Sequence, residues 1–322
     1  MSLRTAALLV SLVTAAAAVA APKTSQAIVQ GNQGLVLQSV TTPVPSAGQV
    51  LLRIYAAGVN PVDWKRRAPV PGFDAAGIVD SVGPDVTAFK PGDAVVARVN
   101  GAYAEYAVAL ADEVIPKPSR FTFEQAAGIP VAGVAGYRAA TDAQLQPGQR
   151  VAIIGAAGGS GEVAVQVAKS HGARIIAVGH SSQQDFLRRL GAAEFVAYDR
   201  DDVAARVQQV DAVINLVEGQ ADAALGYVRR GGRFTSIAGA PADGRCAAAG
   251  VTCVVVGGGY RGPGNGESLR ALAALAERGQ YNVTVYRTFP LAEAAQAQAL
   301  GSSGQSIGKI ILVVVPQNSR RQ

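Results

Sequence analysis

The sequence predicts an α/β protein in which a small β-barrel is joined to a doubly wound domain with a parallel sheet. Three observations lead to this fold class. Apolar strands alternate with helical segments from about residue 123 onward, and a glycine-rich turn follows the first of these strands. Before residue 120 the chain instead shows short strands separated by Gly/Pro turns. Continuous apolar strands that alternate with helices indicate a parallel sheet covered on both faces, and right-handed crossovers make that sheet doubly wound.

The first part of the chain is typical of a small barrel. Residues 50–55 and 77–82 are expected strands, because both are rich in Val, Leu and Ile. Turn signals separate them at residues 45–48, 83–85 and 91–93, where Pro, Gly and Asp gather. Short strands with such turns favour a closed or nearly closed sheet.

The second part predicts a longer series of elements. Helical character begins at residue 123. Strands are expected at 151–154, 174–178, 195–198, 212–216, 233–237 and 252–256, with helices at 162–170, 183–190, 267–278 and 291–300 and a last strand at 310–315. The last segment is expected to return to the first domain. The domains are therefore predicted as 24–122 completed by 262–316, and 123–261.

Residues 1–20 are interpreted as a signal peptide. Arg4 precedes an apolar stretch that ends in Ala18-Val19-Ala20, so cleavage is expected after Ala20. The alternatives are an uncleaved membrane anchor, for which the run is short and Ala-rich, and a transit peptide, for which one arginine is too few. The protein is thus expected to be periplasmic or secreted, with no stable membrane insertion after cleavage.

The cysteines and the charge narrow the possibilities further. Cys246 and Cys253 either form a disulfide, as an oxidising compartment would favour, or remain two separate buried thiols. The net charge is +6 over 322 residues, but the basic residues are dispersed along the chain. A nucleic-acid-binding protein usually gathers them in a stripe, so no nucleic-acid partner is expected.

The strongest motif is a glycine-rich turn that lies between an apolar strand and a helix. Gly155 would allow the tight turn off the strand, Gly158 and Gly159 would let the backbone approach a pyrophosphate, and Gly161 would let the helix pack on the sheet. The helix N-terminus offers free N–H groups to phosphate. The motif predicts a dinucleotide site formed by residues 155–161, including Ala157 and Ser160.

The second strand of this domain favours NADP(H) over NAD(H). An NAD site usually places Asp or Glu at the end of that strand, where it holds the ribose hydroxyls. Here the strand ends in Gly179-His180-Ser181, without an acid. Hydroxyl and imidazole groups can donate to a 2′-phosphate, which a carboxylate would repel.

With these motifs in place, the sequence resembles the zinc-free quinone oxidoreductase branch of the medium-chain dehydrogenase/reductase superfamily. The resemblance covers residues 24–316 and rests on ordered matches at 56–65, 71–77, 89–93, 101–106, 155–169, 190–192, 231–233, 289–294 and 308–310. It implies a GroES-like β-barrel joined to a Rossmann domain, with the active site in the cleft between them. It also implies NADPH as the electron donor to a quinone, an enone or a similar electrophilic carbonyl, and a homodimer joined through the strand at 252–256.

Catalytic zinc is not expected. Zinc-dependent relatives in this superfamily use Cys and His ligands, whereas this chain has Asn60 where a ligand Cys is expected and Phe73-Asp74 where a His-Glu pair is expected. A catalytic zinc needs about three protein ligands of the right type. No metal residues are therefore predicted.

The resemblance assigns the remaining site residues. Asn60 and Asp63 are the candidate catalytic residues, Asn60 as an amide donor to the acceptor carbonyl and Asp63 as a residue that shapes the loop or binds ribose and water; Tyr103 and Lys65 are weaker candidates for a proton relay. The alternative for both Asn60 and Asp63 is simple turn chemistry, because Asn60 precedes a proline. Cofactor contacts are implied for Gly179, His180 and Ser181 near the adenosine ribose, for Tyr198 near the adenine, for Asn215, Val217, Ala238 and Gly239 around the nicotinamide, and for Lys309 from the returning segment.

Two hypotheses for function remain from the sequence. The first is an exported, NADPH-dependent reductase that acts on a small electrophilic acceptor, and the intact glycine turn favours it. The second is an exported binding protein that retains the reductase fold without catalysis, and the export signal favours it, because NADPH is essentially a cytoplasmic metabolite.

Overall fold

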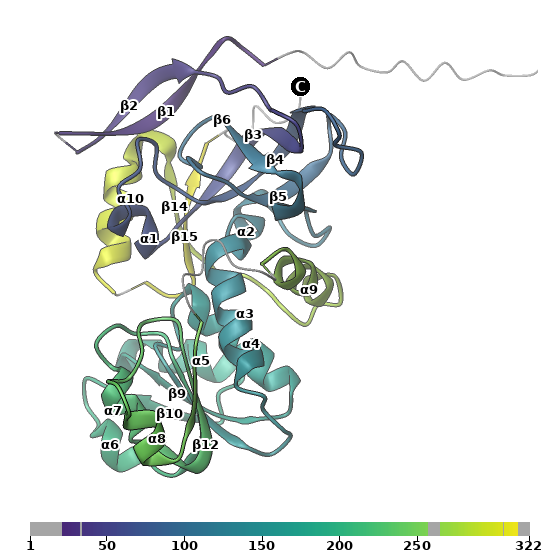
Figure 1. The fold of residues 1–322 in the computed structure, drawn as a ribbon. Coiled ribbons are helices and arrows are strands. Elements are labelled where there is room, and N and C mark those ends of the chain that lie inside the picture. The colour runs from purple at the N-terminus through teal and green to yellow at the C-terminus, as the bar shows by residue number, and fades with distance from the viewer. Residues whose placement is uncertain (1–20, 33, 257–264, 305, 315–322) are drawn as a thin grey trace, which may run out of the picture.

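The computed structural model describes residues 21–32, 34–256, 265–304 and 306–314. They form two lobes that are stacked one above the other in Figure 1, with the helices α3 (Val134–Asp142) and α4 (Gly159–Ser170) between the two sheets. The expected signal peptide, the predicted boundary at 261/262 and residues 315 and 316 lie outside the described residues.

The first lobe is built around a seven-stranded sheet and a separate hairpin. In the sheet the strands follow the order β14-β15-β3-β4-β5-β7, and β6 also pairs with β3. The strands are β1 (Thr24–Gly31), β2 (Gly34–Thr41), β3 (Gln49–Val59), β4 (Asp74–Val82), β5 (Ala94–Arg98), β6 (Tyr106–Leu110), β7 (Val114–Pro116), β14 (Val285–Pro290) and β15 (Lys309–Val313), and the helices are α1 (Pro61–Lys65), α2 (Phe123–Ala126) and α10 (Ala294–Ser302).

The C-terminal strand completes this sheet. β15 pairs antiparallel with β3, with Ile310 opposite Val59. Both strands are almost continuously apolar and buried, which explains why two segments about 250 residues apart in sequence pair in the core. The pairing places Lys309 beside Asn60, at the point where β3 ends and α1 begins.

The second lobe is a parallel six-stranded sheet with helices on both faces. Its order is β10-β9-β8-β11-β12-β13, which is the doubly wound order 3-2-1-4-5-6. Ile153, Ile214 and Phe234 are fully buried in its core. The elements are β8 (Arg150–Ile154), β9 (Arg174–Gly179), α5 (Gln184–Leu190), β10 (Glu194–Ala197), α6 (Val203–Arg206), β11 (Val210–Asn215), α7 (Ala221–Leu225), β12 (Val228–Ser236), α8 (Arg245–Ala249) and β13 (Thr252–Val255). Helix α9 (Asn265–Glu277) packs against α3 and against β7 of the first lobe.

Some predicted boundaries were wrong by a few residues. Helix α4 begins at Gly159 instead of residue 162, because the N–H of Glu162 already donates to the carbonyl of Gly158 (2.9 Å). Strand β12 begins at Val228 instead of residue 233, with a register shift against β11. Strand β10 ends at Ala197, so Tyr198 lies beyond it. None of the described helices is long and apolar enough to cross a membrane.

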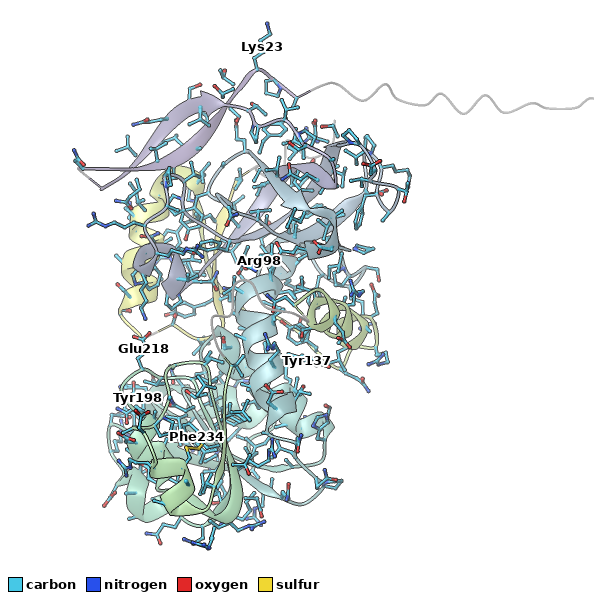
Figure 2. The ribbon with its side chains drawn as sticks, viewed as in Figure 1. Lys23, Arg98, Tyr137, Tyr198, Glu218 and Phe234 are labelled. Atoms are coloured by element: carbon cyan, nitrogen blue, oxygen red, sulfur yellow. A yellow bond between two sulfur atoms is a disulfide. The ribbon has the colours of Figure 1, made fainter. Side chains whose placement is uncertain are left out.

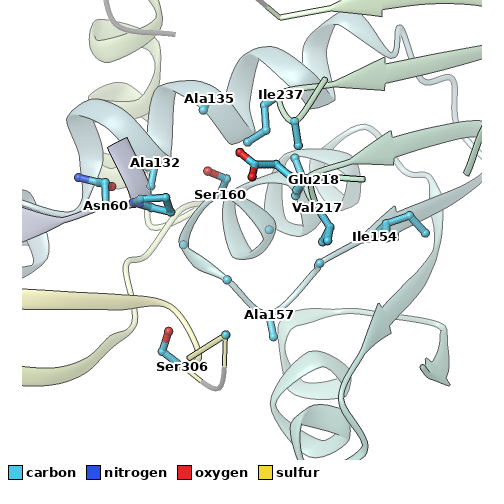
Figure 3. Close-up of a pocket in the computed structure, with 18 of the residues that line it drawn as sticks. Asn60, Ala132, Ala135, Ile154, Ala157, Ser160, Val217, Glu218, Ile237 and Ser306 are labelled. Carbon is cyan, nitrogen blue, oxygen red and sulfur yellow. The ribbon is translucent and has the colours of Figure 1, made fainter. Parts of the chain in front are cut away.

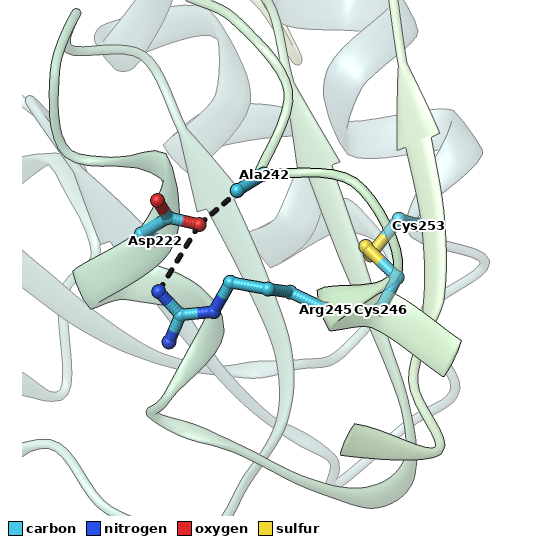
Figure 4. The surroundings of a disulfide bond; sticks show 5 residues. All are labelled: Asp222, Ala242, Arg245, Cys246 and Cys253. Carbon is cyan, nitrogen blue, oxygen red and sulfur yellow. Dashed lines mark hydrogen bonds and ion pairs between the residues drawn. A yellow bond between two sulfur atoms is a disulfide. The ribbon is translucent and has the colours of Figure 1, made fainter. Parts of the chain in front are cut away.

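The two cysteines form a disulfide, which the sequence had left as one of two possibilities. Cys246 on α8 is bonded to Cys253 on β13, with the two Cα atoms 6.1 Å apart. Figure 4 shows the bond beside an ion pair between Arg245 and Asp222 (3.3 Å), whose carboxylate also accepts the N–H of Ala242 (2.9 Å). The disulfide therefore fastens a short helix to the edge strand of the parallel sheet.

Candidate nucleotide-binding site

A cavity of about 1010 Å³ lies between the two lobes. Its size is at the upper end of the usual range for ligand pockets, roughly 300–1,000 Å³. Residues of both lobes line it, among them Asn60, Ser160, Glu218 and Ser306, which Figure 3 shows around the glycine-rich turn. The cavity extends past the carboxyl ends of β8 and β11, where the strand order reverses, and this is the usual ligand position in an open α/β sheet.

Most of the predicted site residues line this cavity. They are Asn60, Gly155, Ala157, Gly158, Gly159, Ser160, Gly161, Gly179, Tyr198, Val217, Ala238 and Lys309. Five others are absent from its lining: Asp63, His180, Ser181, Asn215 and Gly239.

The glycine-rich turn has the geometry that a phosphate cradle needs. Gly155 has a φ of +82°, a left-handed conformation that glycine adopts without strain. A Cβ on Gly161 would lie 2.2 Å from the carbonyl oxygen of Gly155, so the helix can approach the turn only with glycine there. At Gly158 the nearest atom would be 3.8 Å away, so this position is open. The residues present therefore fit a pyrophosphate at the N-terminus of α4.

A buried charged cluster lies at the other end of the turn. The ammonium of Lys309 donates to the carbonyl of Val59 (3.0 Å) and to the side-chain oxygen of Asn60, and lies 3.4 Å from a carboxylate oxygen of Asp74. The aliphatic part of Lys309 passes close to Gly159. A Cβ atom on residue 159 would lie only 2.6 Å from the Cδ of Lys309. Lys309 thus places a positive charge between the phosphate turn and Asn60.

The geometry of Asn60 differs from the role that the sequence implied. Its amide nitrogen donates to Asp74 (2.9 Å) and to the carbonyl of Gly58 (3.4 Å), and its oxygen accepts from Lys309. The amide is therefore fully engaged within the protein. Asn60 therefore holds Lys309 and Asp74 together within the protein, and the ammonium is engaged by Val59, Asn60 and Asp74.

Asp63 lies behind Asn60 instead of at the cavity surface. One of its oxygens accepts the N–H of Asn60 (2.8 Å) and the hydroxyl of Tyr103 (2.8 Å). Within the described part of the chain its other oxygen has no hydrogen-bond partner. Burial, with a smaller contribution from the charge of Asp74, raises the pKa of Asp63 to about 7. Asp63 therefore shapes the loop between β3 and α1 from below.

Burial also raises the pKa of Asp74, although the charge of Lys309 opposes the effect. Asp74 accepts the N–H of Val131 (2.7 Å), which lies within the helical segment 129–133 that leads into α3. Removing one partner of a buried pair such as Lys309 and Asp74 typically costs about 3–5 kcal/mol. The cluster is thus a rigid connection between the loop after β3, the strand β15 and the entry to α3.

Next to the end of the cavity that is expected to hold the adenosine lies a residue that sequence reasoning missed. Both the N–H and the hydroxyl of Ser181 donate to the carboxylate of Asp199, each over 2.7 Å. The imidazole of His180 lies 3.5 Å from the same carboxylate. A ribose-binding acid usually stands at the end of the second strand, whereas Asp199 follows the third. The parallel register, which pairs Ala197 with Gly179, is the signal that would have revealed it.

The residues expected around the nicotinamide divide into two groups. Val217 and Ala238 line the cavity, next to Leu216 and Ile237. Asn215 is fully buried, and its amide nitrogen donates to the hydroxyl of Ser236 (3.2 Å). Asn215 therefore orients the ends of β11 and β12 from within the sheet.

An ion pair joins the lobes across the cavity. Lys65 on α1 contacts Glu218, which follows β11, and both residues line the cavity. Figure 2 shows Glu218 between the two lobes and Tyr198 below it on the second lobe. Both side chains are largely exposed, so the pair contributes little to stability. It does define one wall of the cavity mouth.

The described residues do not fit a catalytic zinc. No three His, Cys, Asp or Glu side chains among them lie where they could hold one metal ion. Asn60 and Phe73 occupy the positions where zinc-dependent relatives are expected to carry Cys and His ligands. Both cysteines of the chain are joined in the disulfide of the second lobe. The groups gathered at Asn60 are its own amide, the carboxylate of Asp74 and the ammonium of Lys309. The ammonium already supplies the positive charge that a zinc ion would bring to this cluster.

Sequence and structure comparisons place the chain among known proteins. Residues 46–119 match the alcohol dehydrogenase GroES-like domain, and residues 190–312 match the zinc-binding dehydrogenase family. The chain is 29% identical over 325 residues to the chloroplastic NADPH-dependent alkenal/one oxidoreductase of Arabidopsis thaliana, covering 92% of this chain and 81% of the relative.

Two solved structures are similar along their whole length. The quinone oxidoreductase from Coxiella burnetii has a TM-score of 0.83 at 28% identity, covering 91% of this chain and 100% of that one. An alcohol dehydrogenase superfamily protein from Novosphingobium aromaticivorans has a TM-score of 0.80 at 31% identity, with the same coverage of 91% and 100%. Together with the ordered motifs and the two-lobed fold, these matches establish that the chain belongs to the medium-chain dehydrogenase/reductase superfamily, in its quinone oxidoreductase branch.

Proposed function

We propose that the protein is an NADPH-dependent reductase that transfers a hydride to a quinone, an enone or a similar electrophilic carbonyl without zinc. The observation that carries the proposal is the single cavity that runs from the glycine turn at Gly158 to the Asn60–Lys309 cluster. A dinucleotide held at one end would present its reactive ring at the other. The similarity to an alkenal/one oxidoreductase and to a quinone oxidoreductase supports this class of acceptor.

Different residues of the chain bind the cofactor and contact the acceptor. NADPH, when bound, supplies the hydride. The turn at 155–161 holds its pyrophosphate, while Val217 and Ala238 line the space for the nicotinamide half. Asn60, which is held by Lys309 and Asp74, lines the end of the cavity where the acceptor would lie. No side chain is assigned as an obligatory acid, and water can deliver the final proton.

The proposal includes metal independence. It is supported by Asn60 and Phe73 at the expected ligand positions and by the ammonium at the cluster. Elemental analysis of purified protein, with activity measured before and after dialysis against a chelator, tests it. Stoichiometric zinc whose removal abolishes activity would contradict metal independence.

Location and assembly are also proposals. We propose that the mature chain begins at Ala21 outside the cytoplasm, and the disulfide is consistent with an oxidising compartment. We further propose a homodimer joined through β13, the edge strand of the second-lobe sheet as described. Sedimentation of the mature chain tests the dimer, and a monomer at all protein concentrations would contradict it.

The decisive experiment is nucleotide binding followed by turnover. The mature chain starting at Ala21 is titrated with NADPH and NADH while nicotinamide fluorescence is followed, and a panel of small quinones and enones is then added. Tight NADPH binding with oxidation by at least one acceptor is the expected result. If well-folded protein binds neither nucleotide, the reductase proposal fails, and the exported binding protein becomes the better hypothesis.

A further inference from the structure

A carboxylate lies next to the lining of the cavity, at the end where the adenosine ribose of a dinucleotide is usually held. Strands β9 and β10 pair in parallel, with Ala197 opposite Gly179, so Asp199 comes to lie opposite Ser181. The N–H and the hydroxyl of Ser181 both donate to this carboxylate over 2.7 Å. The side chain of Asp199 is 24% exposed, so it faces both the protein and the solvent.

The neighbours of Asp199 place it next to the end of the cavity where a ribose is expected. Gly179, Gln183 and Tyr198 line the cavity on either side of it. In a doubly wound domain the groups at the end of the second strand meet the ribose 2′-position, and their charge separates NAD from NADP. A 2′-phosphate carries a charge of roughly −1.5 to −2 and needs several donors, as phosphate monoesters generally do.

The donors that a 2′-phosphate needs are here committed to another anion. Ser181 has one N–H and one hydroxyl, and both are bonded to Asp199. The imidazole of His180 (3.5 Å) and the guanidinium of Arg200 (3.7 Å) lie beside the same carboxylate. The hydroxyl and N–H of Ser181 keep the pKa of Asp199 below its ordinary value, so the group is an anion at neutral pH.

We propose that Asp199 is the residue that sets the preference between NADPH and NADH in this protein. It does so by occupying both donors of Ser181 and by repelling the 2′-phosphate. The carboxylate is also able to accept hydrogen bonds from the ribose hydroxyls of NADH. The inference rests on the proposed function and refines it: the preference for NADPH is narrow in this chain because of one side chain after the third strand.

The test compares two variants that make the same change of charge. Asp199→Asn keeps the shape and removes the charge. Asp185→Asn is the matched control, because Asp185 lies exposed on α5, close in sequence to the same loop, and no contact joins it to Ser181 among the described residues. For each protein the dissociation constants of NADPH and NADH are measured by fluorescence. Adenosine 2′,5′-bisphosphate and 5′-AMP are then used as competitors, and thermal unfolding checks the fold.

The expected result is a shift in the ratio of the two affinities. The wild-type chain should bind NADPH and NADH within about tenfold of each other. Asp199→Asn should move the ratio at least about tenfold toward NADPH, and should tighten adenosine 2′,5′-bisphosphate more than 5′-AMP. Asp185→Asn should leave the ratio within about twofold. If Asp199→Asn does not fold, Asp199→Ser serves as the second variant, with the same expected shift.

Failure of this inference can be distinguished from failure of the proposed function. If the wild type binds both nucleotides but neither Asp199 variant moves the ratio beyond that of Asp185→Asn, the role of Asp199 is wrong and the reductase proposal stands. A wild type that strongly prefers NADPH, by more than about a hundredfold, also overturns the inference. If the folded wild type binds neither nucleotide, both proposals fall together.

Discussion

At the scale of single residues, Gly158 separates the demands of folding from those of binding. It is the N-cap of α4 with extended backbone (φ −72°, ψ 172°), and a Cβ there would meet only the Gly155 oxygen at 3.8 Å. Side chains are thus sterically acceptable at this position, and Asp is even a favourable N-cap residue. The position is nevertheless adjacent to the space for the pyrophosphate. Substitutions at residue 158 can therefore test the steric and the electrostatic effect of a side chain on nucleotide binding separately.

The first prediction concerns two substitutions at this position. Gly158→Asp is expected to weaken NADPH binding at least about 100-fold, because a carboxylate would stand against the phosphates, while its thermal stability remains equal or rises. Gly158→Ala is the control and is expected to change affinity by less than about fivefold. Fluorescence titration and thermal unfolding measure the two quantities. Unchanged NADPH affinity in the Asp variant would show that the pyrophosphate lies elsewhere.

Single residues also show where sequence reasoning stops. The glycine turn was recognisable because its spacing and its strand–helix context are local. Asp199 was missed because its partner Ser181 is reached only through the pairing of two strands. The amide of Asn60 was expected to face the acceptor, but its orientation depends on Lys309 and Asp74, which are distant in sequence. Local motifs are thus readable, whereas the direction of a buried polar group is set by tertiary contacts.

At the scale of elements, Glu162 couples α4 to the segment that leads back to the first lobe. It is buried on the helix, and its two carboxylate oxygens accept the N–H of Thr284, each over 3.2 Å. Gln166, one turn later, exchanges hydrogen bonds with the backbone of Asn282. Burial raises the pKa of Glu162 to about 8. The helix that carries the phosphate turn is therefore fixed to the returning chain by a carboxyl that is mostly protonated at neutral pH.

The second prediction follows from that pKa. Because it is raised from 4.5 to about 8, the native state binds the proton more tightly than the unfolded state. This contribution to stability is fully present below about pH 4.5 and is lost as the pH rises through 8. Glu162→Gln mimics the protonated form, so it should match the wild type near pH 5 and exceed it by about 2–4 kcal/mol at pH 9. Urea unfolding across this range measures it.

A suitable control for this experiment is Glu194→Gln. Glu194 forms a partly exposed ion pair with Arg174, so its loss should change stability little at any pH in this range. If Glu162→Gln and the wild type keep the same pH dependence, the carboxyl of Glu162 is ionised in the folded protein, and its assigned protonation is wrong.

The third prediction concerns the disulfide between α8 and β13. Its cysteines are seven positions apart, and closing so short a loop is worth about 2.5 kcal/mol in the chain-entropy treatment. The double variant Cys246→Ser, Cys253→Ser should lose about this much unfolding free energy in urea. Neither cysteine lines the cavity, so NADPH affinity should stay within about twofold. A loss of affinity with unchanged stability would mean that the bond acts on the site instead of the fold.

At the scale of the whole molecule, the fold class followed from the sequence because each lobe repeats its own pattern. Continuous apolar strands such as 151–154 indicate a parallel sheet, and Gly/Pro turns indicate the barrel. The return of the last strand to the first lobe was expected, but its pairing with β3 across about 250 residues could not be predicted from either segment alone. The ends of helices and strands were predicted less accurately. Helix α4 is an example, because the glycines at its N-terminus are compatible with both a helix and a turn.

The cavity between the lobes depends on this long-range pairing. Lys309 reaches Asn60 only because β15 lies beside β3, and the Gly308 N–H also donates to the carbonyl of Ala157 in the phosphate turn (2.7 Å). One strand of the first lobe therefore contacts both the phosphate turn and the loop at the acceptor end. No single stretch of sequence contains the site, which is assembled from both ends of the chain and its middle.

The fourth prediction links this architecture to the cell compartment. If residues 1–20 direct export, the full chain expressed in a Gram-negative host should be recovered from the periplasm with its N-terminus at Ala21 and no free thiol after unfolding. Leu12→Arg, which interrupts the apolar stretch, should leave a longer chain in the cytoplasm with two free thiols. Mass spectrometry and thiol titration of each fraction measure both. Full-length wild type with free thiols in the cytoplasm would contradict export and place the enzyme beside the cellular NADPH pool. Recovery of the oxidised mature form would mean that a reductase fold meets its nucleotide outside the cytoplasm, where the narrow preference ascribed to Asp199 would let it use whichever dinucleotide is present.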